Sequence, residues 1–473
     1  MIHDFRDTRV SAEHEADVVI VGAGPAGMTL ARELSAVASV LLVEAAGHVT
    51  DADQQALLEG DCVGLPYPLT ETRARAFGGS STLWAGYCAA FDAHDFEARP
   101  GISGSGWPIA RAELEAHYDR VATLLGLGEA DFDAAAIAAE HGLAPPPVDI
   151  GLVLTAWRFG SSTLRFGEHY ADAFAASSTI TTLLHASVVE LRLDATHGRV
   201  NELVLRTLDG RQGRVRAGTV VLACGGIDTA RLLLCSDTQM PCGVGNAHDQ
   251  VGRHFMEHPH RVVPALRAAE VPLLQRSIQR DRYGNGREFM FCFGLTPEAQ
   301  REAGVLNARA HVYRTPSIGD DEAARVGLFM EQEPNPHSRL TLSSRTDALG
   351  MRRARLDWRL TATDQRSWQH TANVLAKAFQ HLGLGTLAAG TDGDAQVVMS
   401  SNHQLGTTRM SRSADDGVVD VHCRIHDLEN AYIIGGSVFP TVSWANPTFT
   451  LMALTLRLAQ HLRSRLQPAR KPA

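Results

Sequence analysis

The sequence lacks any long hydrophobic run. None of its windows approaches the roughly 18 uninterrupted apolar residues that a membrane-spanning helix needs. Its first residues also show no basic segment followed by an apolar core and a cleavage site, the pattern of a secretory signal. We therefore expect a cytoplasmic protein that has no membrane partner.

Cysteine is sparse. The seven cysteines are odd in number and scattered, and none of them forms a C-x-x-C pair or another metal-binding spacing. This excludes a disulfide framework and a zinc site of the usual kind. We expect free thiols and no bound metal.

Positive charge is not in excess. The chain has 44 basic and 53 acidic residues and a net charge of -9, with the two signs interspersed. A nucleic-acid-binding face or a polybasic membrane segment would need clustered lysine and arginine, so both partners are excluded. A length of 473 residues with 44% hydrophobic composition predicts a globular protein of two domains that binds a small molecule.

A nucleotide-binding pattern opens the chain. An apolar run of strand length at 17–21 is followed by GAGPAG and then by apolar residues at helical spacing, from Met28 to Val37. Gly22 permits the tight turn, Gly24 lets a pyrophosphate approach the backbone, and Gly27 lets the helix pack on the strand. The phosphates would lie at the helix N-terminus, whose free N–H groups and dipole favour negative charge.

A second strand, SVLLVE, follows and ends in Glu44, 22 residues beyond Gly22. An acid at this place accepts hydrogen bonds from a ribose hydroxyl pair and repels a 2'-phosphate, which disfavours NADP. The motif alone does not distinguish FAD from NAD.

Two later segments bear on that choice. The run 216–234 is a buried apolar strand that breaks into Gly225 and Gly226 and a helix, after a strand pair at 188–193 and 202–206. The run 428–441 is again an apolar strand ending in glycines. Three apolar strands that each end in glycines predict one nucleotide-binding domain built from both ends of the chain. This favours FAD, because a simple NAD-binding domain would be contiguous in the sequence.

The stretch RARAFGGSSTLWAG at 73–86 has no regular apolar period. It is either a surface loop or a loop whose small residues pass close to an extended cofactor and offer it N–H and O–H groups. In the second interpretation the contacting residues are Gly78, Gly79, Ser80, Ser81 and Thr82.

Seven stretches together resemble the glucose-methanol-choline (GMC) oxidoreductase family, and most of all its pyranose 2-oxidase and sugar dehydrogenase branch. They are GAGPAG with Glu44, FGGSSTLWAG, SGWPI at 105–109, TVVLACGGIDTARLLL, VGRHFMEHP at 251–259, HQLGTTRM, and the closing GGSVFPTVSWANPTFTLMALTLRLA. They extend over residues 17 to 460, whereas about 260–395 matches only loosely.

The resemblance implies an α/β fold (α+β overall) with two domains. A Rossmann-like FAD-binding domain would comprise 1–95, 155–255 and 396–473, and a substrate-binding domain on a mixed or antiparallel sheet would comprise 96–154 and 256–395. Strand-like runs between 288 and 361, followed by a helix at 367–384, would supply the floor of the substrate pocket.

The cofactor implied by the resemblance is FAD. Its further contacts would come from Val188, Ala223, Gly435, Gly436, Pro447 and Thr448. In pyranose oxidases the residue before the tryptophan of the S-T-x-W loop is a histidine bonded covalently to the flavin. Leu83 stands there in this chain and has no nucleophilic nitrogen, so we expect noncovalent FAD.

Oxidation of an alcohol carbon by hydride transfer also requires the hydroxyl proton to leave. A neutral imidazole with an ordinary pKa near 6.5 can accept that proton around neutrality. The resemblance places this base at His403, in SNHQLGTTRM, and places at Asn446 the group that holds the hydroxyl oxygen.

Asn446 has a structural alternative. Asn-Pro directly before an apolar helical pattern is a good N-cap, with Pro447 at the first helical position. Either role puts a helix N-terminus at the site, where its dipole could favour the charge of reduced flavin. Trp444 could line the substrate pocket or simply pack, and Gln404 is a weaker candidate for substrate binding.

His254 and His258 have the i, i+4 spacing of metal ligands on a helix, but Pro259 argues against a continuing helix. The sequence thus predicts an FAD-dependent enzyme that oxidises a CH–OH group of a sugar, glycoside or other polyol-like molecule. Oxygen, a quinone or another acceptor would reoxidise the flavin. An NADPH-dependent flavin monooxygenase is the alternative enzyme, and a flavin-binding scaffold without activity is the non-enzymatic one.

Overall fold

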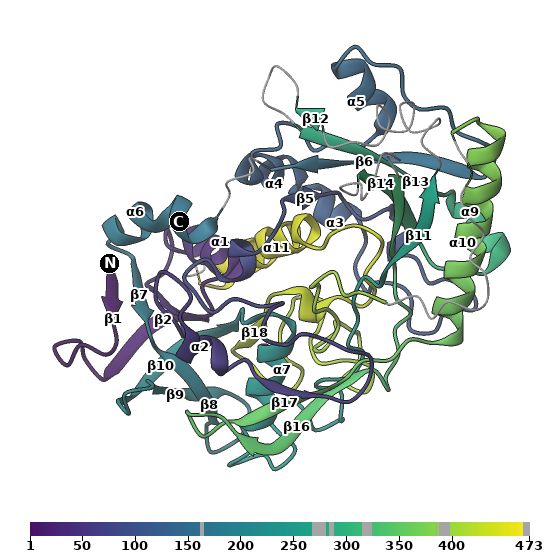
Figure 1. Ribbon diagram of the computed structural model, residues 1–473. Helices are drawn as coiled ribbons and strands as arrows, with labels where there is room; N and C mark the ends of the chain where they lie inside the picture. The colour runs from purple at the N-terminus through teal and green to yellow at the C-terminus, as the bar shows by residue number, and fades with distance from the viewer. Residues whose placement is uncertain are drawn as a thin grey trace, which may run out of the picture.

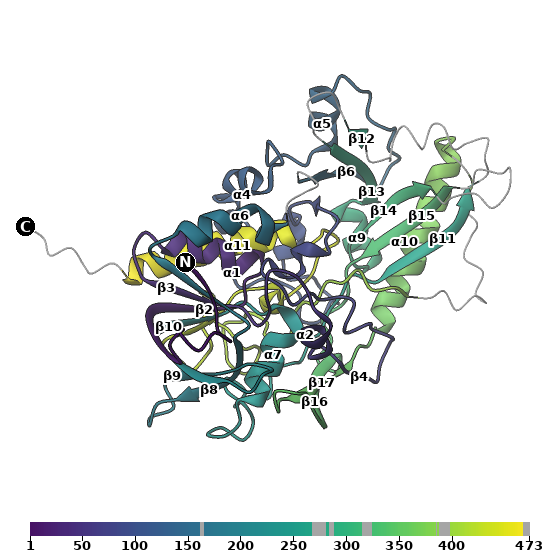
Figure 2. The ribbon, with the colours of Figure 1, turned by 60° about the vertical axis from the view of Figure 1, so that its left-hand side comes forward.

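The computed structural model describes residues 1–160, 165–266, 281–282, 288–314, 324–384, 386 and 398–466. These residues form two large sheets and a small third one, with helices over the large sheets. Figures 1 and 2 show one large sheet with the N-terminus beside it and the other large sheet on the far side of the molecule.

The first large sheet has a parallel centre. The strand β2 (Glu13–Val21) pairs in parallel with β3 (Val40–Val43) on one side and with β10 (Gln212–Leu222) on the other. Beyond β3 lie β7 (Ile180–Leu184) and then β1 (Ile2–Asp4). The last four residues of β2 and all of β3 are buried, as expected of parallel strands covered on both faces.

The strand β10 joins distant segments to this sheet. It pairs in parallel with β18 (Ala431–Ile433), and in antiparallel with β9 (Val200–Arg206), which pairs with β8 (Ser187–Leu193). Figures 1 and 2 show α1 (Pro25–Leu34) and α11 (Thr448–Leu466) side by side over the sheet. One nucleotide-type sheet is therefore assembled from both ends of the chain, and the predicted α/β class is confirmed.

The second large sheet is antiparallel at every described pairing. Its order is β11 (His260–Leu266), β15 (Ala324–Met330), β14 (Ala308–Arg314), β13 (Glu288–Leu295), β6 (Leu152–Phe159) and β5 (Tyr87–Cys88), with β12 (Asp281–Arg282) on β13. The predicted domain boundary at residue 155 runs through β6, although the eight residues of β6 all pair with β13.

Two predicted strands lie elsewhere. We expected the runs at 338–344 and 353–361 in the substrate-domain sheet, but β16 (Arg339–Thr346) and β17 (Arg352–Asp357) form a separate sheet with β4 (Gly60–Cys62). The reason is β4, which pairs in parallel with β17 from nearly 300 residues away in the sequence. Such pairing leaves no local signal.

The long helix α10 (Ala362–His381) packs on the antiparallel sheet, where Phe379 meets Phe293 of β13 edge to face at 5.2 Å. It begins five residues before its predicted start, because Thr361 and Asp364 form a capping box. The remaining elements are α2 (Ala52–Ala56), η1 (Gly79–Thr82), η2 (Ala93–Phe96), α3 (Ala112–Glu115), α4 (Tyr118–Leu125), α5 (Ala134–Glu140), α6 (Phe166–Ala176), α7 (Gly225–Cys235), α9 (Pro297–Ala303) and η4 (Gly436–Val438).

No helix in the described part of the chain is long and apolar enough to cross a membrane. All seven cysteines are free thiols. The described residues contain no group of three or more histidine, cysteine or acidic side chains that could hold a metal ion, and His254, with a φ of 57°, lies outside any helix.

Candidate active site

The glycine-rich turn after β2 is shaped for a close ligand. Gly22 has a φ of 104°, and a Cβ on it would lie 2.6 Å from the carbonyl oxygen of Ala223. A Cβ on Gly27 would strike the carbonyl oxygen of Gly22, so α1 can pack this closely only on a glycine. A Cβ on Gly24, in contrast, would have no protein atom within 4 Å and would project into open space.

Glu44 stands beside this turn, directly after β3. One carboxylate oxygen accepts the backbone N–H of Ala23 at 2.9 Å and the other accepts that of Ala46 at 3.1 Å. Burial raises the pKa of Glu44, while these backbone hydrogen bonds and Arg75 act in the opposite direction. Each oxygen keeps a second lone pair that could accept a ribose hydroxyl.

A cavity of about 540 Å³ extends from this turn to the C-terminal segments. Most of the expected site residues line this one space, although they are as far apart in the sequence as residues 22 and 448: Gly22, Gly24, Glu44, Gly79, Ser80, Ser81, Val188, Ala223, His403, Gln404, Gly435, Gly436, Asn446, Pro447 and Thr448. Leu83 and Trp84 also line it.

Three expected cofactor residues lie behind the cavity wall instead. Gly27 underlies the turn, Gly78 donates its N–H to Ala23 at 2.8 Å, and the Thr82 hydroxyl donates to the carbonyl of Gly79 at 3.1 Å. They shape the loop without lining the cavity. Trp444 is also outside the lining: only 2% of it is exposed, and its indole packs on Trp157.

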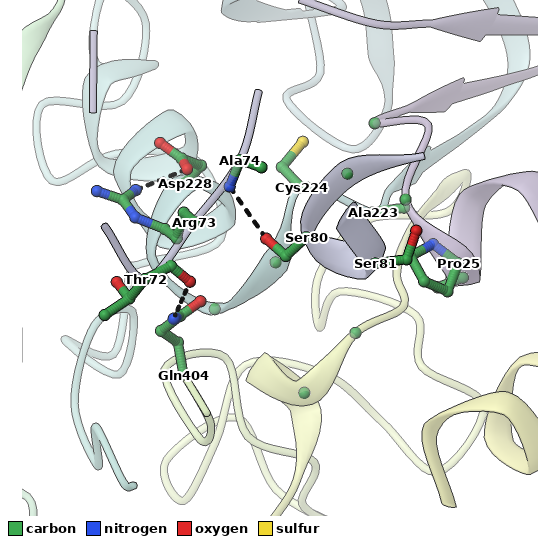
Figure 3. Close-up of a pocket in the computed structure, with 18 of the residues that line it drawn as sticks. Pro25, Thr72, Arg73, Ala74, Ser80, Ser81, Ala223, Cys224, Asp228 and Gln404 are labelled. Carbon is green, nitrogen blue, oxygen red and sulfur yellow. Dashed lines mark hydrogen bonds and ion pairs between the residues drawn. The ribbon is translucent and has the colours of Figure 1, made fainter. Parts of the chain in front are cut away.

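The segment 72–74 lies at the cavity wall in Figure 3, where three hydrogen bonds hold it. Ser80 accepts the N–H of Ala74 at 3.2 Å, Arg73 donates to Asp228 at 2.7 Å, and the Gln404 amide donates to the carbonyl of Thr72 at 3.2 Å. Gln404 thereby has its amide nitrogen engaged by protein.

His403 and Asn446 meet at the other end of the cavity. The Nε2 atom of His403 lies 3.4 Å from the amide nitrogen of Asn446. Burial, together with the neighbouring His258, holds the pKa of His403 well below its usual range, so this imidazole is neutral near pH 7. It has the protonation state that a general base needs.

Asn446 does not act as a helix cap. Its Oδ1 atom is buried and has no hydrogen-bond partner among the described residues. The carbonyl of Pro447 accepts the first N–H of α11, from Leu451 at 2.8 Å, so Pro447 precedes the first helical residue, Thr448. The N-cap alternative is therefore not what the structure shows, and the expected place of Pro447 inside the helix is wrong by one residue.

Comparisons with known proteins match two parts of the chain. A family model described as FAD dependent oxidoreductase matches residues 17–243, and one described as GMC oxidoreductase matches residues 334–455. The N-terminal part of the chain thus matches FAD-dependent oxidoreductases, and its C-terminal part matches GMC oxidoreductases.

Individual relatives match nearly the whole chain. The 6'''-hydroxyparomomycin C oxidase of Streptomyces lividus is 25% identical over 96% of this chain and 93% of its own. The paromamine 6'-oxidase of Streptomyces fradiae is 26% identical over 94% and 90%. The crystal structure of pyridoxine 4-oxidase from Mesorbium loti shares the fold, with a TM-score of 0.61, 19% identity, and coverage of 94% of this chain and 98% of its own.

The cofactor of this oxidoreductase is FAD, and the residues present fit it. The turn offers the N–H groups at the start of α1, where the first turn contains no acidic side chain. Gly24 leaves room for a ligand, and the buried Nη1 of Arg75 has no partner among the described residues. These residues would hold the adenosine and pyrophosphate parts.

A buried carboxyl group organises the end of the cavity at His403, and the sequence analysis missed it. Glu257 accepts the backbone N–H groups of His403 at 2.7 Å, of His258 at 2.7 Å and of Ser401 at 3.0 Å, and the hydroxyl of Tyr67 at 3.2 Å. Burial raises the pKa of Glu257 to about 8. In the sequence Glu257 stands inside VGRHFMEHP, beside His258, and nothing local marks it as a partner of His403.

Proposed function

We propose that this oxidoreductase oxidises a CH–OH group of a sugar, glycoside or other polyol-like small molecule to a carbonyl. The observation that carries the proposal is the placement of His403 and Asn446 in the same cavity as the glycine turn. Two relatives named for oxidation of paromamine and of a hydroxyparomomycin support a polyol-like substrate.

The residues divide the work. His403 accepts the hydroxyl proton at Nε2, the nitrogen that faces Asn446. The amide of Asn446 holds the hydroxyl oxygen, so that the carbon–hydrogen bond is oriented for transfer. When bound, FAD supplies the acceptor for the hydride that leaves the same carbon. Burial of the ring keeps the base neutral.

The polar lining near His403 also supports a hydroxyl-rich substrate. Ser400, Ser401, Asn402 and Gln404 line the cavity on the same short segment, and His260 lines it from the start of β11. Several of these groups already have protein partners: the Ser401 hydroxyl donates to the carbonyl of His258 and the Gln404 amide donates to that of Thr72. Their remaining hydrogen-bonding capacity suits a hydroxyl-rich substrate better than a hydrocarbon alcohol.

The test is an anaerobic titration of the purified protein with a panel of sugars, glycosides and simple alcohols, followed by NADPH, with absorbance recorded near the flavin band. Bleaching by a sugar-like alcohol is the expected result. If only NADPH bleached the flavin, the protein would instead be an NADPH-dependent flavin monooxygenase.

The role of His403 is tested by His403→Ala, which should slow flavin reduction by about 10² to 10⁴-fold. The matched control is His370→Ala on the exposed face of α10, which should reduce at the wild-type rate. Equal rates for His403→Ala and wild type would mean that another group is the base.

Cofactor attachment gives an independent prediction. Leu83 lines the cavity and is 52% exposed, but leucine cannot bond to the flavin ring. Acid precipitation of the holoprotein should release all yellow colour into the supernatant. Colour retained in the washed pellet would show a covalent link through another residue.

A further inference from the structure

A second buried histidine lies directly behind the proposed base. His258 is fully buried, and its Nδ1 atom lies 2.8 Å from Nδ1 of His403. The two rings are nearly perpendicular, at 88°, with their centroids 4.9 Å apart. The other ring nitrogen of His258, Nε2, lies 2.9 Å from the carbonyl oxygen of Val442.

These contacts determine where the protons are. A carbonyl oxygen can only accept, so Nε2 of His258 carries its proton and donates to Val442. Burial lowers the pKa of His258 to about 4, so the ring is neutral and has no second proton. Its Nδ1 therefore has a lone pair and must accept, and the donor at 2.8 Å is Nδ1–H of His403.

The proton on Nδ1 of His403 also determines the state of its Nε2 atom, at the cavity. Because neutral His403 has its proton on Nδ1, its Nε2 has a lone pair. The neighbour of that Nε2, at 3.4 Å, is the amide nitrogen of Asn446, which can only donate. The chain of groups from Val442 through His258 and His403 to Asn446 is thus consistent in every donor and acceptor.

We propose that His258 is a positioning residue that fixes the tautomer of His403, so that Nε2 is the nitrogen available to take the substrate proton. The inference rests on the proposed function of His403 as the base. Which imidazole nitrogen is protonated is set by the hydrogen bond that the other nitrogen makes. In the opposite tautomer His403 would present N–H to the substrate and could not accept its proton.

The backbone keeps the two rings in register. One carboxylate, Glu257, accepts the N–H of His258 on one oxygen and the N–H of His403 on the other. The hydroxyl of Ser401 donates to the carbonyl of His258 at 2.8 Å. The segments that bear the two histidines, 145 residues apart, are therefore tied together within a few ångströms of the rings.

The arrangement also serves the protonated state. After His403 takes the proton at Nε2, its Nδ1–H becomes a charged donor, and the hydrogen bond to His258 becomes stronger. No proton has to move between the rings for this effect, because the bond already has the required direction.

The test uses three variants of His258 in the holoenzyme. In His258→Asn the amide oxygen can stand near the place of Nδ1 and keep an acceptor for His403. His258→Gln offers its amide near the place of Nε2 and leaves no acceptor beside His403, and His258→Leu removes both hydrogen bonds. We expect flavin reduction at saturating substrate to slow by at least about 10-fold in the Gln and Leu variants, with substrate affinity little changed, and to remain closest to wild type in His258→Asn.

A readout besides activity comes from histidine labelled with ¹⁵N. In the wild-type protein, the resonances that disappear in His403→Ala should report a protonated Nδ1 and an unprotonated Nε2. The His258→Leu spectrum should show protonated Nε2 in a substantial fraction of His403. A wild-type spectrum with Nε2–H on His403 overturns the inference even if every variant of His258 fails to fold.

The two proposals fail separately. A wild-type rate in His403→Ala removes the proposed base itself. A large loss in His403→Ala together with a wild-type rate in His258→Leu removes only the role of His258. Equal losses in His258→Asn and His258→Leu would assign His258 a structural role, since the acceptor would then not matter.

Discussion

His403 should work at pH values where an exposed histidine would already be charged. Its pKa is held well below 6.5 by burial and by the neighbouring His258. A base is active when unprotonated, so activity is present above the pKa and lost as the pH falls through it. The rate constant of flavin reduction should therefore stay nearly constant from pH 8 to pH 6. A fall centred near pH 6.5 would contradict the neutral, buried state of this ring.

Asn446 can be tested for catalysis and capping at once. Since its Oδ1 caps no backbone N–H, Asn446→Ala should lower the free energy of unfolding by less than the roughly 1 kcal/mol of a lost cap. The same substitution should slow flavin reduction by about 10-fold or more, because the hydroxyl oxygen loses its donor.

The control for Asn446→Ala is Thr361→Ala at the start of α10. The Thr361 hydroxyl accepts the N–H groups of Thr363 and Asp364, so this variant should lose about 1 kcal/mol of stability and keep its rate. If Asn446→Ala lost as much unfolding free energy as Thr361→Ala and kept the wild-type rate of flavin reduction, Asn446 would be a helix cap and not a catalytic residue.

At the scale of elements, the turn between β2 and α1 makes a clear prediction. A Cβ at Gly24 meets no protein atom within 4 Å, so Gly24→Ala should fold normally. The same methyl group would enter the space expected for the pyrophosphate, so the dissociation constant for FAD should rise at least about 10-fold. The control is Gly198→Ala, on a surface loop, where an added Cβ would lie 3.4 Å from its nearest neighbour, the hydroxyl oxygen of Thr196. This variant should bind FAD as the wild type does. If Gly24→Ala bound FAD with unchanged affinity, the pyrophosphate would not lie against Gly24.

This unit was also the part most open to prediction from sequence. The β2–α1–β3 segment is contiguous, and its apolar periods and glycines are local signals. The strand pair β8–β9 was predicted for the same reason and is confirmed by its antiparallel register. Elements whose partners are distant, such as β4 with β17, gave no such signal.

The site follows the same rule. Motifs and the family resemblance led to His403 and Asn446, but not to His258 as a partner, because that contact joins residues 145 apart. His258 was instead considered as a metal ligand from its i, i+4 spacing with His254. With a φ of 57°, His254 is not in a helical conformation, so the i, i+4 spacing does not place the two histidines on one face of a helix. Periodicity within a segment says nothing about a neighbour from another segment.

At the scale of the whole molecule, buried titratable groups should shape the stability curve. Five buried or mostly buried histidines have lowered pKa values: His254 and His311 to about 3, His258 and His260 to about 4, and His403 well below 6.5. As the pH falls below about 6.5, the unfolded chain takes up protons on them that the native protein cannot, so stability is lost.

Three acids act in the opposite direction. Burial raises the pKa of Asp364 to about 6, of Asp95 to about 7 and of Glu257 to about 8. For each acid, the protein loses stability as the pH rises from the pKa of the acid in the unfolded chain to its pKa in the native protein. The sum places the highest unfolding temperature near neutral pH. Thermal unfolding followed by circular dichroism from pH 5 to 8.5 measures this. A midpoint that rises steadily toward pH 5 would contradict it, and Asp95→Asn should flatten the alkaline side.

The cavity also sets an order of events in the making of the protein. Its walls include Gly22 at one end and Pro447 at the other, 425 residues apart in the sequence. A ribosome releases the N-terminal turn long before it has synthesised the segment that closes the flavin site. Cofactor capture therefore belongs to the finished chain and not to the nascent one, and a cell short of flavin would accumulate apoprotein that can still take up the cofactor.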